Sequence, residues 1–164
     1  MITRFKDEYE FLDTFHIHPF IYNGVEYPTV QHAYQCSKCL DVKDAETILR
    51  YGPYDANKLG NIFHRKKNWS NAKYNVMFEI LFAKLSSQPF ADKLIATGRQ
   101  FQVDVQFNDK RAHWSYIPGM PYVGNYYGKL LMLVRYALTD MRFNYYDKDL
   151  IDSVVNIAFD ENIF

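Results

Sequence analysis

The chain of 164 residues carries 19 Lys and Arg against 19 Asp and Glu, so its formal net charge is zero. Apolar residues make up 48% and charged residues 23%, which excludes a disordered chain and is typical of one globular domain. The balanced charge gives no overall attraction to nucleic acid or to anionic membranes. The sequence has no apolar run of membrane-spanning length, no apolar signal segment and only two cysteines. We therefore expect a cytoplasmic protein with no membrane partner.

A short hairpin and three helices are expected in the first part of the chain. The first 27 residues otherwise look irregular or extended, and Asn23-Gly24 is a two-residue turn signal between two short strands. Thr29 is expected to cap a helix that runs to about Leu40. Two short helices should follow, at about 45–51 and 54–63.

The second part of the chain is expected to be mostly helical. Its elements, in order, are an amphipathic helix capped by Ser70, a short helix at 89–96, a strand at 101–105, a long loop at 106–124, a helix at 125–139 and a helical tail at 143–164. The helix at 125–139 is apolar nearly all round, so it should lie buried at the centre of the domain. The predicted class is α+β, helix-dominated: a single compact domain, 1–164, with a small N-terminal hairpin.

The sequence lacks the common cofactor and hydrolase motifs. It has no Gly-x-Gly-x-x-Gly, P-loop, Gly-x-Ser-x-Gly or His-Glu-x-x-His segment. His32, Cys36 and Cys39 share a helical face, but no second cysteine pair completes a zinc site, so we expect two small buried thiols. No metal and no cofactor are expected.

Two patterns could line a ligand site. Gln31, Gln35 and Lys38 form a polar stripe on the helix after Thr29; this stripe is either a solvated face or a pocket wall in which amides read a base edge and the lysine meets phosphate. Trp69 either packs on Tyr74 as a hydrophobic staple or provides a platform for stacking a base.

A third pattern lies in the long loop. Asp104, Asp109 and Trp114 stand in or before this loop, which ends at Gly124-Asn125, directly before a helix. A helix start with a glycine nearby is suited to an anion, although carboxylates there can simply cap the helix.

Five blocks of the sequence, in order, resemble the NADAR (YbiA-like) family. YPTVQHAYQCSK at 27–38 resembles the family segment YPTVEHxYQxxK. ANKLG at 56–60 resembles AKxLG, Trp69 followed by Met77 resembles a W…M helix, LIATG at 94–98 resembles LLATG, and GNYYGKLLMLVR at 124–135 resembles GxNxLGKxLMxxR. The family-like blocks span about 11–138, which leaves 143–164 as an extra tail.

The resemblance implies a YbiA-like fold and cleavage of an N-glycosidic bond in a riboside. The substrates associated with the family are phosphorylated ribosylamino-pyrimidine intermediates of riboflavin synthesis and ADP-ribosylated guanine, which links it to NAD and ADP-ribose metabolism. The partner would be such a small molecule, or a modified nucleic acid. The sugar passes through an oxocarbenium-like state, so the site needs a carboxylate, a frame for the base and cations for phosphate.

The resemblance also implies the site residues. The catalytic set would be Gln31, Trp69, Asp104 and Asp109. The substrate-binding set would be His32, Gln35, Lys38, Trp114, Gly124, Asn125 and Lys129.

This chain departs from the family pattern at positions that matter for the chemistry, among them two in the resembling blocks. The family glutamate of the VEH segment is Gln31, and the lysine of AKxLG is Asn57. An amide cannot act as a general base or stabilise positive charge as a carboxylate does. Three hypotheses follow: an N-glycosidase, a catalytically weakened module that binds a nucleotide or ADP-ribose, and a scaffold with a vestigial pocket.

Overall fold

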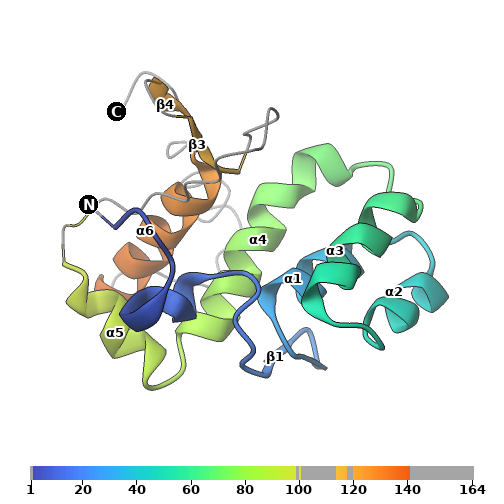
Figure 1. Cartoon of the computed structure of the whole chain (residues 1–164), viewed down its shortest axis with the longest axis horizontal. Helices are drawn as coiled ribbons and strands as arrows, with labels where there is room; N and C mark the ends of the chain where they lie inside the picture. Colours follow the sequence, from blue (N-terminus) through green and yellow to red (C-terminus); the bar gives the residue numbers. More distant parts are fainter. Residues whose placement is uncertain (1, 99, 101–113, 118–119, 141–164) are drawn as a thin grey trace. The chain divides into compact units, whose positions relative to one another are not determined.

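The computed structural model describes residues 2–98, 100, 114–117 and 120–140 (Figure 1). Two compact units are distinguished: unit 1 combines Met1–Leu12 with Leu85–Phe164, and unit 2 is Asp13–Lys84. The described residues are rich in helix, with two small two-stranded antiparallel sheets. The expected α+β, helix-dominated class is therefore confirmed. The expected strand at 101–105 and tail at 143–164 lie outside the described residues, and the domain limits stay a prediction.

Unit 2 begins with the expected hairpin. Strand β1 (Phe20–Tyr22) pairs with β2 (Val25–Tyr27) in antiparallel register, with Phe20 opposite Tyr27. Asn23 and Gly24 have φ values of 50° and 77°, the left-handed pair that a two-residue turn requires. The Asn-Gly signal is thus confirmed.

Helix α1 (Val30–Lys38) carries most of the polar stripe and is buried along nearly its whole length. The Thr29 side chain accepts a hydrogen bond from the backbone N–H of His32, as the capping prediction required. The helix ends before the expected Leu40. Cys39 turns into extended backbone and forms a bridge with Arg65, and the N–H of Leu40 donates to the carbonyl of His64 at 2.8 Å.

Two helices pack on α1. Helices α2 (Val42–Ile48) and α3 (Pro53–Ile62) both contact it, as the right-hand side of Figure 1 shows. Helix α2 begins three residues earlier than expected because the Asp41 side chain accepts a hydrogen bond from the N–H of Lys43 and so caps it there.

Helix α4 (Trp69–Leu85) is the longest described helix. It begins one residue before Ser70, so the expected Ser70 cap is wrong; the carbonyl of Asn68 accepts the N–H of Ala72 at 3.2 Å. The expected apolar face is present, since Met77, Phe78 and Leu81 are buried.

Unit 1 contains a 3₁₀ helix, η1 (Asp7–Leu12), where irregular backbone was expected. Its Phe11 ring stacks on Phe90 of α5 (Phe90–Ala96), with 5.7 Å between ring centroids.

Part of the expected long loop is instead a hairpin of β3 (Tyr116–Ile117) and β4 (Met120–Gly124). Helix α6 (Tyr126–Thr139) follows and, as predicted, is mostly buried.

Candidate functional site

Five polar side chains from α1 and α3 form a hydrogen-bonded group in unit 2, which we call the amide–lysine cluster. Its members are Gln31, Gln35 and Lys38 of α1 and Asn57 and Asn61 of α3. The spacing of four residues between Gln31 and Gln35, and between Asn57 and Asn61, places each pair on one helical face. The polar stripe of α1 is therefore turned toward α3 rather than toward solvent.

Asn57 is the centre of the cluster. Its Oδ1 accepts hydrogen bonds from Nε2 of Gln31 at 2.8 Å and from Nε2 of Gln35 at 3.0 Å. Nδ2 of Asn61 approaches the same oxygen at 3.5 Å. Three N–H groups thus converge on one carbonyl oxygen, which holds the amides of Gln31 and Gln35 in defined orientations.

Gly60 allows α1 and α3 to approach closely at this point. A Cβ built on Gly60 would lie 2.6 Å from Cδ and 2.8 Å from Cβ of Gln35, so any side chain at position 60 would force Gln35 to move. Gln35 is only 3% exposed, and its Oε1 is buried without a hydrogen-bond partner. The absence of a side chain at position 60 is what lets this amide lie between the helices.

Lys38 completes the cluster at the end of α1. Its Nζ donates to Oδ1 of Asn61 at 3.2 Å, and the residue is 8% exposed. Burial lowers the pKa of Lys38; the neighbouring Cys39 acts in the opposite direction, and the cation of Arg65 lowers the pKa further.

The loop after α3 brings further cations beside Lys38. The N–H of Lys66 donates to the carbonyl of Lys38 at 3.0 Å, and Arg65 pairs with Cys39 in the isolated bridge. His64, Arg65, Lys66 and Lys67 are all exposed. This end of the cluster therefore offers positive charge to an anion such as a phosphate.

Both ring nitrogens of His32 are occupied by protein partners. Nε2 lies 2.8 Å from the carbonyl oxygen of Tyr51, which can only accept, so Nε2 carries the proton. Nδ1 then accepts from the hydroxyl of Thr29 at 2.8 Å. His32 is 1% exposed, so in this structure it joins α1 to the chain after α2.

Trp69 is placed by aromatic packing. Its ring meets Tyr34 edge to face with 5.1 Å between centroids, and the residue is 5% exposed. Tyr34 directly precedes Gln35, so Trp69 supports α1 next to the cluster. The partner found for Trp69 is thus Tyr34 of α1, a residue that neither sequence interpretation had considered.

The other predicted site residues are divided between unit 1 and the undescribed part of the chain. Gly124 and Asn125 have φ values of 76° and 54°, and the N–H of Asn125 donates to the carbonyl of Ser115 at 2.9 Å. The carbonyl of Trp114 accepts a hydrogen bond from the N–H of Tyr127, so this backbone N–H at the start of α6 already has a partner. Nζ of Lys129 lies 5.0 Å from the centroid of the Tyr126 ring.

Asp104 and Asp109 lie outside the described residues. Asn61 and Gly60 were not among the site residues predicted from the sequence, although Asn57, Gly60 and Asn61 fall at helical spacing that could have indicated a polar face. Lys84, which is 1% exposed near the end of α4, was not predicted either. Burial lowers the pKa of Lys84 to about 8, against a smaller upward effect of Asp13.

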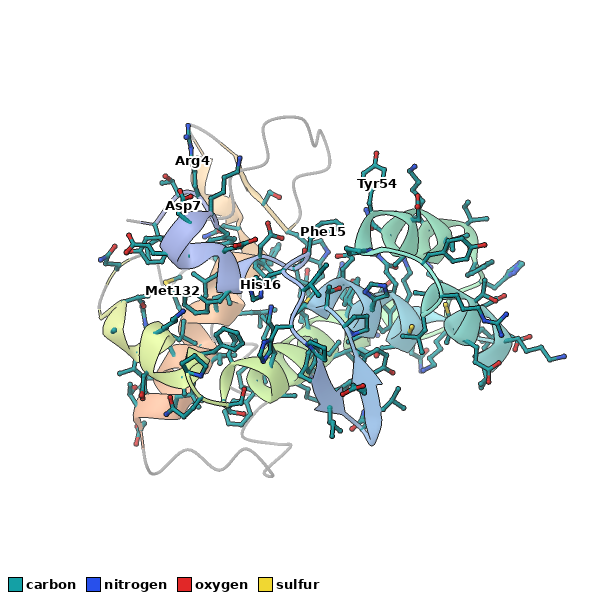
Figure 2. The ribbon with its side chains drawn as sticks, turned by 60° about the horizontal axis from the view of Figure 1, so that its bottom comes forward. Arg4, Asp7, Phe15, His16, Tyr54 and Met132 are labelled. Atoms are coloured by element: carbon teal, nitrogen blue, oxygen red, sulfur yellow. The ribbon has the colours of Figure 1, made fainter. Side chains whose placement is uncertain are left out.

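Some polar features near the cluster belong to the surface. Figure 2 shows Tyr54 pointing outward from α3, and it is 65% exposed. Nζ of Lys58 lies 4.3 Å from its ring centroid and 3.4 Å from Oδ1 of Asp55. These exposed contacts make Lys58 a suitable control position on the same helix.

Comparison with known proteins now identifies the family. The family model of the NADAR domain matches residues 3–139. The chain belongs to the NADAR domain family. It is 32% identical over 113 residues to the N-glycosidase YbiA of Escherichia coli, covering 66% of this chain and 69% of that protein, and matches the N-glycosidase YbiA of Shigella flexneri equally.

A solved structure supports the same assignment. The NMR structure of the E. coli protein YbiA matches with a TM-score of 0.71 and 28% identity, covering 89% of each chain. Within the described residues of this NADAR chain, no helix has the length and apolar character needed to cross a membrane. Across the same residues, no group of three or more His, Cys, Asp or Glu could hold a metal ion.

Proposed function

We propose that this NADAR protein hydrolyses the N-glycosidic bond of a phosphorylated riboside or of an ADP-ribosyl group on a nucleobase. The observation that carries the proposal is the amide–lysine cluster. It contains Gln31 and Asn57, the positions where the family pattern has a glutamate and a lysine, and it also contains Lys38. The cluster combines the buried amides of Gln31 and Gln35, which can hold a base or a water molecule, with a cation at its edge. The relatives named N-glycosidase YbiA support the reaction class.

In this proposal each cluster residue has a role. Gln31 orients the attacking water, Gln35 holds the amide frame, and Lys38 meets phosphate with the Nζ donors that Asn61 does not use. Asp104 or Asp109 supplies the negative charge that stabilises the oxocarbenium-like sugar. Trp69 supports the wall of the site through Tyr34.

A second candidate, a binding module without turnover, is favoured by one specific observation. In the described part of unit 2, the cluster contains four amides and one lysine, and no carboxylate is hydrogen-bonded to it. A neutral amide at position 31 stabilises a developing cation far less than a carboxylate would. Such a cluster could hold a nucleotide or an ADP-ribose group while catalysing little or no cleavage.

Base release and binding distinguish the two functions. The purified protein is incubated with a phosphorylated ribosylamino-pyrimidine and with an oligonucleotide that carries ADP-ribosylated guanine, and free base or free ADP-ribose is measured by mass spectrometry. Slow release that is lost in Asp104→Asn or Asp109→Asn, and kept in Lys58→Ala, supports the glycosidase. Micromolar binding by calorimetry with no release from either compound supports the binding module, and neither binding nor release refutes both.

A further inference from the structure

The hydrogen bonds of the amide–lysine cluster converge on Oδ1 of Asn57, and Lys38 sets which atom of each amide donates and which accepts. A lysine ammonium has three donors and no acceptor, whereas each carboxamide can present either its oxygen or its NH₂ group. The orientation of every amide in a connected network therefore depends on the one member that cannot reverse. In this cluster that member is Lys38.

The direction can be followed one contact at a time. Because Lys38 only donates, Asn61 must turn Oδ1 toward it, at 3.2 Å. Asn61, which is exposed, then presents Nδ2 to Asn57 at 3.5 Å, the longest contact of the cluster, and Asn57 faces it with Oδ1. With Oδ1 of Asn57 facing α1, Gln31 can approach at 2.8 Å only through Nε2, and Gln35 must do the same at 3.0 Å.

These hydrogen bonds decide which atom Gln31 offers to a ligand. Nε2 of Gln31 gives one of its two protons to Asn57, and this orientation turns the carbonyl Oε1, the acceptor of the amide, away from Asn57. We propose that Lys38 is a positioning residue, which acts through Asn61 and Asn57 to make Gln31 present a hydrogen-bond acceptor to the ligand. This inference rests on the proposed function for the meaning of that acceptor: it would orient the O–H of an attacking water molecule or an N–H of the base.

Exchanging the donor and acceptor atoms of one amide alone is costly. Turning Gln31 alone would place its Oε1 against Oδ1 of Asn57 at hydrogen-bonding distance and leave two oxygens facing each other. A change at Lys38, the fixed end, lets Asn61, Asn57 and Gln31 turn together; the two protons of Asn57 Nδ2 then go to Asn61 and Gln31, and Gln35 gives up its bond to Asn57. Lys38→Glu would do so, since a carboxylate accepts and does not donate, and the nearby Arg65 and Lys66 would balance its charge.

NMR can identify the donor and the acceptor of each hydrogen bond, whether or not the protein is active. A scalar coupling through the hydrogen bond joins ¹⁵Nε2 of Gln31 to ¹³Cγ of Asn57 only when Gln31 is the donor. We expect this coupling in the wild-type protein and in Lys38→Arg, because arginine also only donates. In Lys38→Glu we expect it to disappear and to be replaced by a coupling from ¹⁵Nδ2 of Asn57 to ¹³Cδ of Gln31.

Several results would overturn the proposal. The reverse coupling in the wild-type protein refutes the assigned polarity without any variant. An unchanged wild-type pattern in Lys38→Glu shows that Lys38 does not set it. If Lys38→Glu does not fold, Lys38→Met serves instead: a coupling reduced at least twofold supports the proposal, and an unchanged coupling refutes it. A protein that shows the expected couplings but releases no base would refute the proposed glycosidase alone.

Discussion

Gln35 lies directly against Gly60, so closely that its amide occupies the space a side chain at position 60 would need. The contact joins α1 to α3 at the point where Asn57 also holds Gln35 by a hydrogen bond of 3.0 Å. Both the close packing of the helices and the order of the amide–lysine cluster therefore depend on a residue without a Cβ.

We expect Gly60→Ala to destabilise the protein even though alanine favours a helix by about 1 kcal/mol over glycine. The new methyl group would displace Gln35, at a cost of about 1–3 kcal/mol for an overpacked site. Urea unfolding of the single and double variants checks this. In a Gln35→Ala background the clash is absent, so Gly60→Ala should become neutral or stabilising; destabilisation of equal size in both backgrounds would contradict the prediction.

At position 31 we expect Gln31→Glu to raise the rate of base release at least tenfold, because a carboxylate stabilises the cationic sugar. The new carboxylate would face Oδ1 of Asn57, which lies 2.8 Å from Nε2 of Gln31. The double variant Gln31→Glu with Asn57→Lys should therefore release base faster still, because an ammonium group, which attracts the new carboxylate, replaces the repelling oxygen of Asn57. Single-turnover assays with a phosphorylated riboside measure both. A fast wild type that Gln31→Glu leaves unchanged would show that position 31 is not catalytic.

Lys84 should make stability rise with pH. Burial lowers its pKa from 10.5 to about 8, so below pH 8 both states are protonated and the folded state bears the full cost of a buried charge. Between pH 8 and 10.5 the unfolded chain binds more protons than the folded one, and that cost declines by ~3 kcal/mol.

The measurement is the free energy of unfolding of the wild type minus that of Lys84→Met at several pH values. This difference should increase from pH 8 to 10.5. A flat difference would mean that Lys84 titrates normally in the folded protein. Lys58→Met, with its exposed ammonium, is the control that should show no such slope.

Cys36 should react slowly with thiol reagents. Burial, and to a smaller extent Cys39, raise the pKa of Cys36 from 9.0 to about 12, and its thiol donates to the carbonyl of Ala45 at 3.4 Å. At pH 8 a thiol with that pKa has roughly a thousandfold less thiolate than an ordinary one. In Cys39→Ser, which leaves Cys36 as the chain's one cysteine, labelling by Ellman's reagent should be far slower in the native protein than in denaturant. Equal rates would refute the burial of this thiol.

Local sequence signals determined several elements of this protein. Asn23-Gly24 specifies the hairpin because few other residues accept two consecutive positive φ values. Thr29 specifies the start of α1 because its hydroxyl oxygen accepts the N–H of His32. The apolar composition of α6 specified its burial in the same way, without reference to any distant residue.

Only the tertiary structure decided what the polar stripe of α1 does. A stripe of Gln31, Gln35 and Lys38 has the same periodicity whether it faces water or another helix, so the pattern alone cannot choose between them. The choice is made by residues more than twenty positions away: Asn57 and Asn61 supply the hydrogen-bond partners. Gly60, between them, leaves the space that Gln35 fills. Burial of polar groups is stable only where partners meet them, and the packing of α1 on α3 brings those partners into reach.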